Sequence, residues 1–177
     1  MADADRNSSQ KDENYWKVLD AVIRLEVNKG HLMWKITDLA RASDVARPLI
    51  YYYFGKSKEE IVQAALKIIG DEFFGLSEER IEMWRGGDVV GSVLKTRTLM
   101  EKAPYVPVFF FHWRHQPGEI SSHLKDLEDR YRAKIALLRP DLSGAQIEGL
   151  FATFFGLVLF PNINEQTIRF VIKATGL

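Results

Sequence analysis

Hydrophobic residues recur every three or four positions through much of the chain, which is the spacing of one face of an α-helix. Near the start this pattern comprises Tyr15, Val18, Leu19, Val22 and Leu25. It stops at Gly30, and glycine commonly ends a helix because it adopts a left-handed backbone at little cost. The pattern predicts a first helix over about residues 12–29.

A capping-box motif marks a second helix start. Ser57 is followed three residues later by Glu60, so the hydroxyl and the carboxylate can each accept from a backbone amide at a helix N-terminus. We therefore expect a helix to begin at Lys58. Its hydrophobic period continues to Phe73, and no obligatory helix breaker precedes Gly86-Gly87, so this helix is expected to be long.

The C-terminal half contains similar signals for the starts of helices. Ser143 and Gln146 form a second capping box, and Asn162 or Asn164 is expected to cap a last helix. Residues 89–102 and 120–138 are periodic between these starts. Residues 108–113, Val-Phe-Phe-Phe-His-Trp, suit a strand by propensity alone, but we predict a helix because no partner strand is present. The chain is expected to be all-α, with about nine helices.

Composition narrows the class of protein. The 177 residues are 46% hydrophobic and 27% charged, which is typical of a globular chain with a real core. There is no cysteine, so disulfides and thiolate metal sites are excluded. Residues 1–14 are polar and charged and lack the apolar segment of a secretory signal, and we expect residues 1–13 to form a disordered tail. The longest apolar run, residues 149–161, is too short to span a bilayer, so a cytoplasmic protein without membrane contact is expected.

Residues 36–55 have the spacing of a helix-turn-helix. Such a motif needs a small residue where two helices cross, a left-handed turn residue four positions later and an apolar residue six positions after that, and Ala40, Asp44 and Ile50 meet these needs. The expected inner face comprises Leu39, Val45, Ile50 and Phe54, and the expected outer face comprises Arg47, Leu49 and Tyr52.

The net positive charge of residues 29–58 is consistent with binding to DNA. The chain as a whole is neutral, with 24 basic and 24 acidic residues, but residues 29–58 hold six basic residues against two acidic ones. A surplus of positive charge is what a phosphate-facing surface requires. The alternative from spacing alone is an ordinary helical hairpin whose three tyrosines belong to the core.

Several short motifs within residues 14–66 resemble the DNA-binding domain of the TetR family of transcriptional regulators. They are Gly30, Leu39-Ala40, Asp44-Val45, Ile50-Tyr51, Phe54 and Ser57-Lys58-Glu59-Glu60. Departures from the family pattern are Asp44 for glycine, Ala46 for a capping serine, Lys35 for a capping threonine, and one extra residue at Gly55-Lys56.

The resemblance implies a DNA-binding domain at residues 14–57 and a helical effector-binding and dimerisation domain at 58–177. The recognition helix, about residues 46–54, would enter the major groove. Arg47 would read a guanine, Leu49 and Tyr52 would contact thymine methyls, and Lys58 would hold a phosphate. Tyr51 and Tyr53 would bind phosphates or lie partly in the core, and Thr37 would bind phosphate or simply cap its helix. The expected DNA-binding set is Lys35, Thr37, Arg47, Pro48, Leu49, Tyr51, Tyr52, Tyr53 and Lys58.

Aromatic residues cluster at 105–113 and 151–160, and such a cluster is most often core. By the resemblance, some of them would line a pocket for a small apolar or aromatic effector, with Arg114, His112 and Trp84 as polar anchors. The expected ligand-binding set is Trp84, Met100, Phe109, His112, Trp113 and Phe151. The expected dimer seam of the last two helices is Phe151, Phe154, Leu157, Val158, Ile168 and Ile172.

No motif of an enzyme is present, and we expect no cofactor. His112, His115 and Glu119 could ligate zinc, although such residues are far more often solvated. The expected function is a homodimeric, ligand-responsive repressor that binds a near-palindromic double-stranded DNA operator. The alternatives are an all-helical carrier of apolar ligands without DNA binding and a small helical enzyme without a cofactor.

Overall fold

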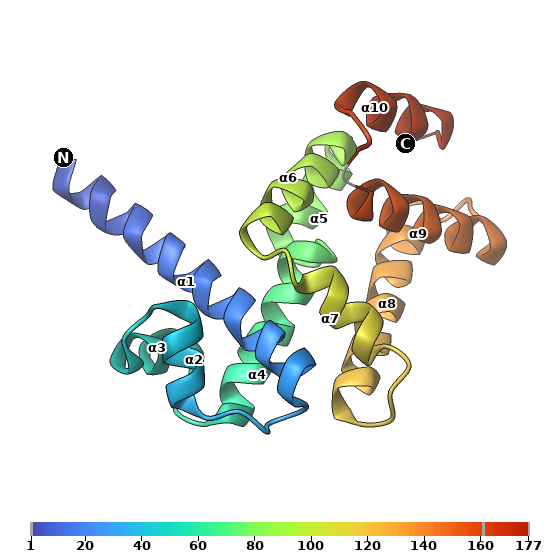
Figure 1. Ribbon diagram of the computed structural model, residues 1–177. Helices are drawn as coiled ribbons and strands as arrows, with labels where there is room; N and C mark the ends of the chain where they lie inside the picture. Colours follow the sequence, from blue (N-terminus) through green and yellow to red (C-terminus); the bar gives the residue numbers. More distant parts are fainter. Residues whose placement is uncertain (1, 161, 177) are drawn as a thin grey trace. The chain divides into compact units, whose positions relative to one another are not determined.

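The computed structural model describes residues 2–160 and 162–176, and in this part of the chain it contains helices and no strand (Figure 1). The predicted all-α fold is confirmed. By contacts the chain divides into two compact units, one comprising the residues up to Lys67 with Lys102–Gly118, and the other Ile68–Glu101 with Glu119–Leu177. Each unit is described by itself below.

The first unit contains five helical segments. They are α1 (Ala2–Lys29), α2 (Ile36–Ser43), α3 (Arg47–Phe54), most of α4 (Lys58–Ile68) and α7 (Val106–Trp113). Figure 1 shows α2 and α3 beside the C-terminal half of α1. The core is formed by the apolar stripe that predicted the first helix, joined by residues of the other helices, and includes Val18, Leu19, Val22, Leu39, Ile50, Phe54, Ile61 and Phe109.

Helix α1 ends where the sequence predicts but begins earlier. Gly30 has a φ of 92° and its amide donates to the carbonyl of Glu26, so the glycine ends the helix as expected. The N-terminus is at Ala2 instead of near residue 12. The reason is that residues 2–12 include no glycine or proline, so no residue in this polar segment obliges the helix to stop. The disorder expected for residues 1–13 stays a prediction, and Met1 lies outside the described residues.

Helix α7 belongs to the first unit, which the local sequence pattern did not predict. Residues 102–118 were grouped with the C-terminal domain in the sequence-based division at 57/58, but in the structure they pack with α1. The amide of Tyr105 donates to Asp20 of α1 at 3.2 Å, and burial raises the pKa of that carboxyl group. The helix predicted for residues 108–113 is confirmed, with Pro107 in its first turn.

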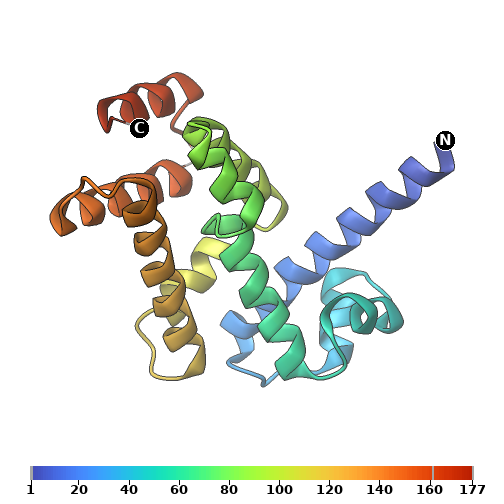
Figure 2. The same cartoon turned by 180° about the vertical axis from the view of Figure 1, so that it is seen from behind.

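The second unit comprises the remaining helices: the π-helical turn η1 (Ile69–Phe73), α5 (Glu78–Arg85), α6 (Val89–Lys102, apart from its last residue), α8 (Glu119–Leu138), α9 (Gly144–Leu159) and α10 (Glu165–Ala174). Seen from behind in Figure 2, the chain turns sharply from α8 into α9. The capping box predicted at Ser143 is confirmed by bonds in both directions with Gln146. Asn164 caps α10 by accepting from the amide of Thr167 at 2.8 Å.

The single long helix predicted from Lys58 toward Gly86 is wrong. Helix α4 widens into η1 and the chain then turns at Gly75, which has a φ of +59°. Gly70 lies so close to α8 that an added Cβ would stand 2.7 Å from a methyl of Leu127. This close packing of η1 on α8 is a tertiary contact, so the hydrophobic period alone could not reveal where the helix ends.

Candidate nucleic-acid interface

Helices α2 and α3 are joined by a turn centred on Asp44. This residue has φ 54° and ψ 35°, the left-handed conformation predicted for it. Helix α3 then begins at Arg47, with Pro48 in its first turn, where a proline has no helical hydrogen bond to lose. The predicted helix-turn-helix register is therefore confirmed at its turn.

The two faces of this motif separate as the sequence predicts. Leu39, Val45, Ile50 and Phe54 are all less than 5% exposed and form the inner face. On the opposite face of α3, Leu49 is 39% and Tyr52 is 73% exposed, and Arg47 is also exposed. A tyrosine and a leucine held in water beside an arginine form a surface suited to base edges and thymine methyls.

The N-terminus of α3 has no side-chain cap. Ala46 is extended and has no side chain able to accept the first amides of the helix, unlike Ser143 in α9. Uncapped amides at a helix start attract anions because they are unpaired donors at the positive end of the helix dipole. The departure from the family's capping serine therefore leaves this end of the recognition helix open to a phosphate.

Positive charge around the motif is largely uncompensated within the chain. Lys29 is the exception, because its ammonium pairs with Asp38 at 2.8 Å and, by this hydrogen bond, lowers the pKa of that carboxyl group. Within the described part of the chain, four exposed basic residues form no ion pair, namely Lys35, Arg41, Arg47 and Lys56. These charges are available to neutralise phosphates.

The turn between α1 and α2 is held by a buried acid that our sequence reasoning missed. Glu26 is 1% exposed, and its carboxylate accepts from Trp34 Nε1 at 2.5 Å and from the amide of Leu32 at 3.1 Å. His31 Nδ1 lies 2.9 Å from its other oxygen. A signal was present, since Glu26 follows Val22 by four residues and so lies on the apolar stripe of α1.

Lys58 is half-buried and has a hydrogen-bond partner within the chain. It begins α4, and its ammonium donates to the carbonyl of Leu32 at 2.5 Å. Leu32 has a φ of 57°, an unfavourable backbone conformation for leucine, and its amide and carbonyl are both bonded. Lys58 therefore helps to position the turn beside α2, and two ammonium hydrogens remain for a phosphate.

The link from α3 to α4 explains the extra residue seen in the sequence. Gly55 has φ 116° and ψ 172°, a region used almost only by glycine, and an added Cβ would stand 2.6 Å from Glu60. Ser57 accepts from the amide of Glu60 at 3.1 Å, which confirms half of the predicted capping box. The carboxylate of Glu60 reaches Lys56 instead of Ser57, accepting from its amide at 2.6 Å.

The remaining predicted DNA contacts lie at the surface to different degrees. Tyr51 is 37% exposed, and Tyr53 is half-buried with its ring 5.1 Å from that of Tyr52. Thr37 is half-buried in the first turn of α2, and Lys35 is exposed immediately before it. Their roles on DNA stay predictions.

The predicted effector-binding residues fall in both units. Phe109, His112 and Trp113 belong to the first unit, and His112 and Trp113 are in ring contact at 5.0 Å. Trp84, Met100 and Phe151 belong to the second unit. Within the second unit, Trp84 and Phe151 both pack against Tyr131, with ring centroids 6.1 and 5.7 Å apart.

The predicted dimer seam needs correction. Phe154, Leu157, Ile168 and Ile172 are at most 4% exposed within a single chain, so they are core residues of the second unit. Phe151 and Val158 are half-buried. The apolar residues exposed near these helices are Phe160, between α9 and α10, at 64% and Phe170, in α10, at 73%. Helical period could not distinguish the two faces, because both carry large apolar side chains.

Two further observations concern metals and membranes. The described residues contain no group of three or more histidine, aspartate or glutamate side chains able to hold a metal ion, so they give no support to a zinc site at His112 and His115. No helix in the same part of the chain is both long and apolar enough to cross a bilayer.

A left-handed turn between two short helices, the second with a polar and aromatic outer face, defines a helix-turn-helix DNA-binding protein. Comparison with protein families agrees, because residues 19–65 match the family of bacterial regulatory proteins called the tetR family. Residues 19–65 thus form a DNA-binding domain similar to that of the tetR family, which supports a DNA-binding transcriptional regulator. No curated protein and no solved structure matched the chain.

Proposed function

We propose that the protein is a dimeric repressor that leaves its operator when a small apolar or aromatic effector binds the second unit. The outer face of α3 carries the DNA-binding part of this proposal. Arg47 has the fork geometry that matches guanine O6 and N7, and Leu49 and Tyr52 are the exposed apolar surface next to it. Lys58 and the uncapped start of α3 supply the phosphate contacts.

The effector part of the proposal is supported by the aromatic interior of the second unit. Rings of Phe74, Trp84, Tyr131, Phe151, Phe154 and Phe155 form a continuous cluster, with centroids 4.8–6.2 Å apart. An open pocket of about 450 Å³ adjoins it at Trp84, and its other lining includes Arg85, Val89, Leu137 and Arg139. This volume is within the range of small-molecule sites.

The dimer part of the proposal rests on the exposed apolar side chains near the end of the chain. Phe160 and Phe170 together leave large rings in water, which soluble monomers usually avoid when they form a patch. A dimer would place two recognition helices in successive major grooves about 34–36 Å apart, on a near-palindromic operator. Sedimentation at micromolar concentration should give a dimer that Phe170→Ser weakens. A wild-type monomer would contradict the two-site model.

Two basic residues on the proposed interface should have different effects on DNA binding, one on base preference and the other on overall affinity. Arg47→Ala is expected to cost about 1–3 kcal/mol of binding free energy per half-site and to relax base preference at one position. Lys58→Ala is expected to weaken binding to all sequences and to lower the salt slope by about one per subunit. Because Lys58 also donates a hydrogen bond to Leu32, the melting temperature of the Lys58→Ala variant must be measured alongside its DNA affinity.

The operator for this test comes from sequencing the genomic fragments that the purified protein retains. Binding to the operator and to scrambled duplex is then measured across a salt series. Lys125→Ala is the matched control, since Lys125 is an exposed lysine of α8 and belongs neither to the proposed DNA interface nor to the proposed dimer contact. If both Arg47→Ala and Lys58→Ala lose affinity equally for every sequence, Arg47 is a backbone contact. If neither loses affinity, DNA is bound elsewhere and the proposal fails.

A further inference from the structure

Two positive side chains are buried next to each other in the second unit. Arg80 of α5 is 1% exposed and Lys134 of α8 is 5% exposed. A Cβ placed on Gly75 would stand 3.5 Å from both Arg80 Nε and Lys134 Nζ, so the two nitrogens are separated by no more than twice that distance. Burying one unpaired charge is costly, and burying two of the same sign together is more so.

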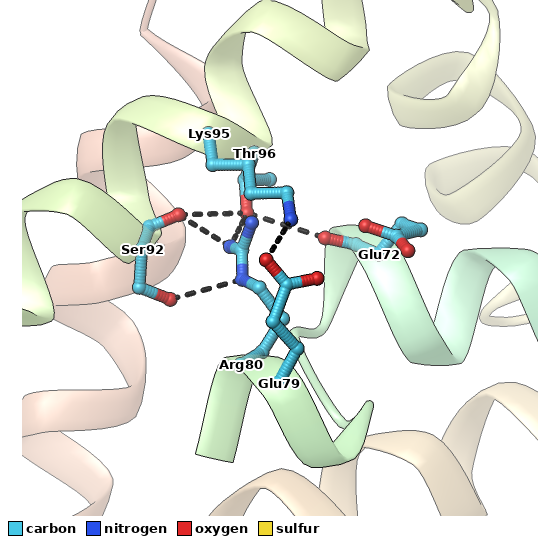
Figure 3. Close-up of polar contacts among 6 residues, drawn as sticks. All are labelled: Glu72, Glu79, Arg80, Ser92, Lys95 and Thr96. Atoms are coloured by element: carbon cyan, nitrogen blue, oxygen red, sulfur yellow. Dashed lines mark hydrogen bonds and ion pairs between the residues drawn. The ribbon is translucent and has the colours of Figure 1, made fainter. Parts of the chain in front are cut away.

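Arg80 uses only part of its hydrogen-bonding capacity. Its Nε donates to Ser92 Oγ at 3.1 Å, and its Nη2 donates to the carbonyl of Ser92 and to the hydroxyl of Thr96, both on α6 (Figure 3). The third nitrogen, Nη1, is buried with no hydrogen-bond partner. An unpartnered guanidinium nitrogen in the interior is rare and requires an explanation.

The two acids that act on Arg80, Glu72 and Glu79, do not form an ion pair with it. Figure 3 shows the carboxylate of Glu79 directed to Lys95, which it pairs with at 2.6 Å. Glu72 supplies its backbone carbonyl to the hydroxyl of Thr96 at 3.3 Å. Glu72 favours the charged form of Arg80 through space, but among the described residues no acid forms an ion pair with this guanidinium.

Lys134 is equally without an acid in the described part of the chain. Its ammonium donates to the carbonyls of Gly75 at 3.0 Å and Phe74 at 3.5 Å. The same nitrogen lies over the rings of Trp84 and Tyr131, 4.3 and 4.4 Å from their centroids. Burial, together with the nearby charge of Arg80, lowers the pKa of Lys134 to about 7. Neither cation therefore has an acidic partner within bonding distance among the described residues.

We propose that the effector is a small organic carboxylate whose anionic group binds between Arg80 and Lys134; this inference rests on the proposed function. Arg80 Nη1 is a buried donor without an acceptor, the Lys134 ammonium near it has only backbone carbonyls as acceptors, and a carboxylate matches the fork of a guanidinium. The aromatic cluster around Trp84 and Tyr131 would contact its apolar body. The carboxylate links α5 to α8 and supplies the missing charge.

Gly75 allows this assignment to be tested without knowing the ligand. An aspartate there carries its own carboxylate toward both cations, and aspartate tolerates the left-handed backbone found at this position. Gly75→Asn is the matched control, with almost the same shape and backbone preference but no charge. Gly75→Asp is expected to melt at least about 2–4 °C above Gly75→Asn. Equal melting temperatures, or a lower one for Gly75→Asp, would overturn the proposal.

A second experiment uses defined probes. Benzoate, phenylacetate and hexanoate, each at millimolar concentration, are compared with their neutral amides by the shift in melting temperature of the full-length protein. At least one carboxylate should raise it by about 2 °C or more while its amide does not. Lys134→Met, which keeps the apolar contact and removes the charge, and Gly75→Asp should both abolish the shift.

The outcomes separate this inference from the proposed function. If the amides stabilise the protein as much as the acids, or if no carboxylate stabilises it, the anion site is wrong, and operator binding is unaffected by that result. If the protein retains no genomic DNA, the repressor proposal fails. The comparison of Gly75→Asp with Gly75→Asn still decides whether a carboxylate is bound by Arg80 and Lys134.

Discussion

Glu26 in the first unit and Lys134 in the second are both charged side chains withdrawn from water, but their surroundings differ. Glu26 accepts from the indole of Trp34 and the amide of Leu32, and His31 lies within hydrogen-bond distance. Lys134 has two backbone carbonyls, two ring faces and a second cation, Arg80, as neighbours.

The difference shows what each charge does for the protein. A buried charge is tolerated when hydrogen bonds replace the water that it loses. In the first unit those partners are part of the chain, so Glu26 fixes the turn that leads into α2 and stabilises the fold. In the second unit the neutralising partner is missing from the described residues, so the charges reduce stability until an anion binds.

The largest expected effect comes from breaking the satisfied site. Glu26→Ala leaves the buried Trp34 indole and the half-buried Leu32 amide without an acceptor, and it should lower the free energy of unfolding by about 3–5 kcal/mol. Chemical denaturation measures it. Glu13→Ala is the control, because Glu13 is an exposed acid of the same helix that forms a surface ion pair with Lys17, and the variant should cost less than about 1 kcal/mol. Similar losses for both variants would remove Glu26 from its structural role.

The opposite sign is expected for Lys134. Lys134→Met should raise the free energy of unfolding at pH 7 by roughly 1–4 kcal/mol, because a buried charge without an acid is replaced by an apolar chain of similar length. Lys125→Met, at an exposed position of the same helix, should change stability by less than about 0.5 kcal/mol. A clear loss of stability in Lys134→Met would mean that the ammonium is already satisfied within the fold.

The pH dependence of stability sharpens this contrast. The folded-state pKa of Lys134 is about 7, whereas the unfolded chain keeps this proton up to its usual value of 10.5. Between these values the unfolded state binds more protons, so stability should rise with pH, by up to about 1.4 kcal/mol per unit. Above about pH 10 the trend reverses, because burial raises the pKa of Tyr131 and the unfolded state then loses that proton more readily. Denaturation at pH 7, 8 and 9 should show the rise in wild type and not in Lys134→Met.

The smallest expected effect concerns the backbone of the first unit. The unfavourable feature there is a left-handed backbone at Asp44, whereas in the second unit it is buried charge. Asp44→Gly should raise the free energy of unfolding by about 0.5–1 kcal/mol, since glycine pays no steric cost at a φ of 54° and loses part of the gain through its unfolded-state entropy. Thermal melts of the two proteins decide it, with Asp44→Asn expected to lie close to wild type. Destabilisation by glycine would mean that the Asp44 side chain has a role that the turn geometry does not explain.

Much of the DNA-binding unit could be predicted because its signals are local. The left-handed turn at Asp44, the buried set from Leu39 to Phe54 and the exposed set around Tyr52 all follow from spacing within twenty residues. The site in the second unit could not be predicted in this way. Arg80, Lys134 and Gly75 are up to about sixty residues apart, and each looks ordinary among its sequence neighbours.

By itself the sequence determined the all-α class, the helix-turn-helix with its inner and outer faces, and most helix ends, because capping, glycine turns and helical period act between residues close in the chain. Only the tertiary structure decided that α4 ends in a π-helical turn against Leu127, that Glu26 is buried with its donors, and that Ile168 and Ile172 face their own chain. Burial and ion pairing depend on which distant segments meet, and local patterns do not carry that information.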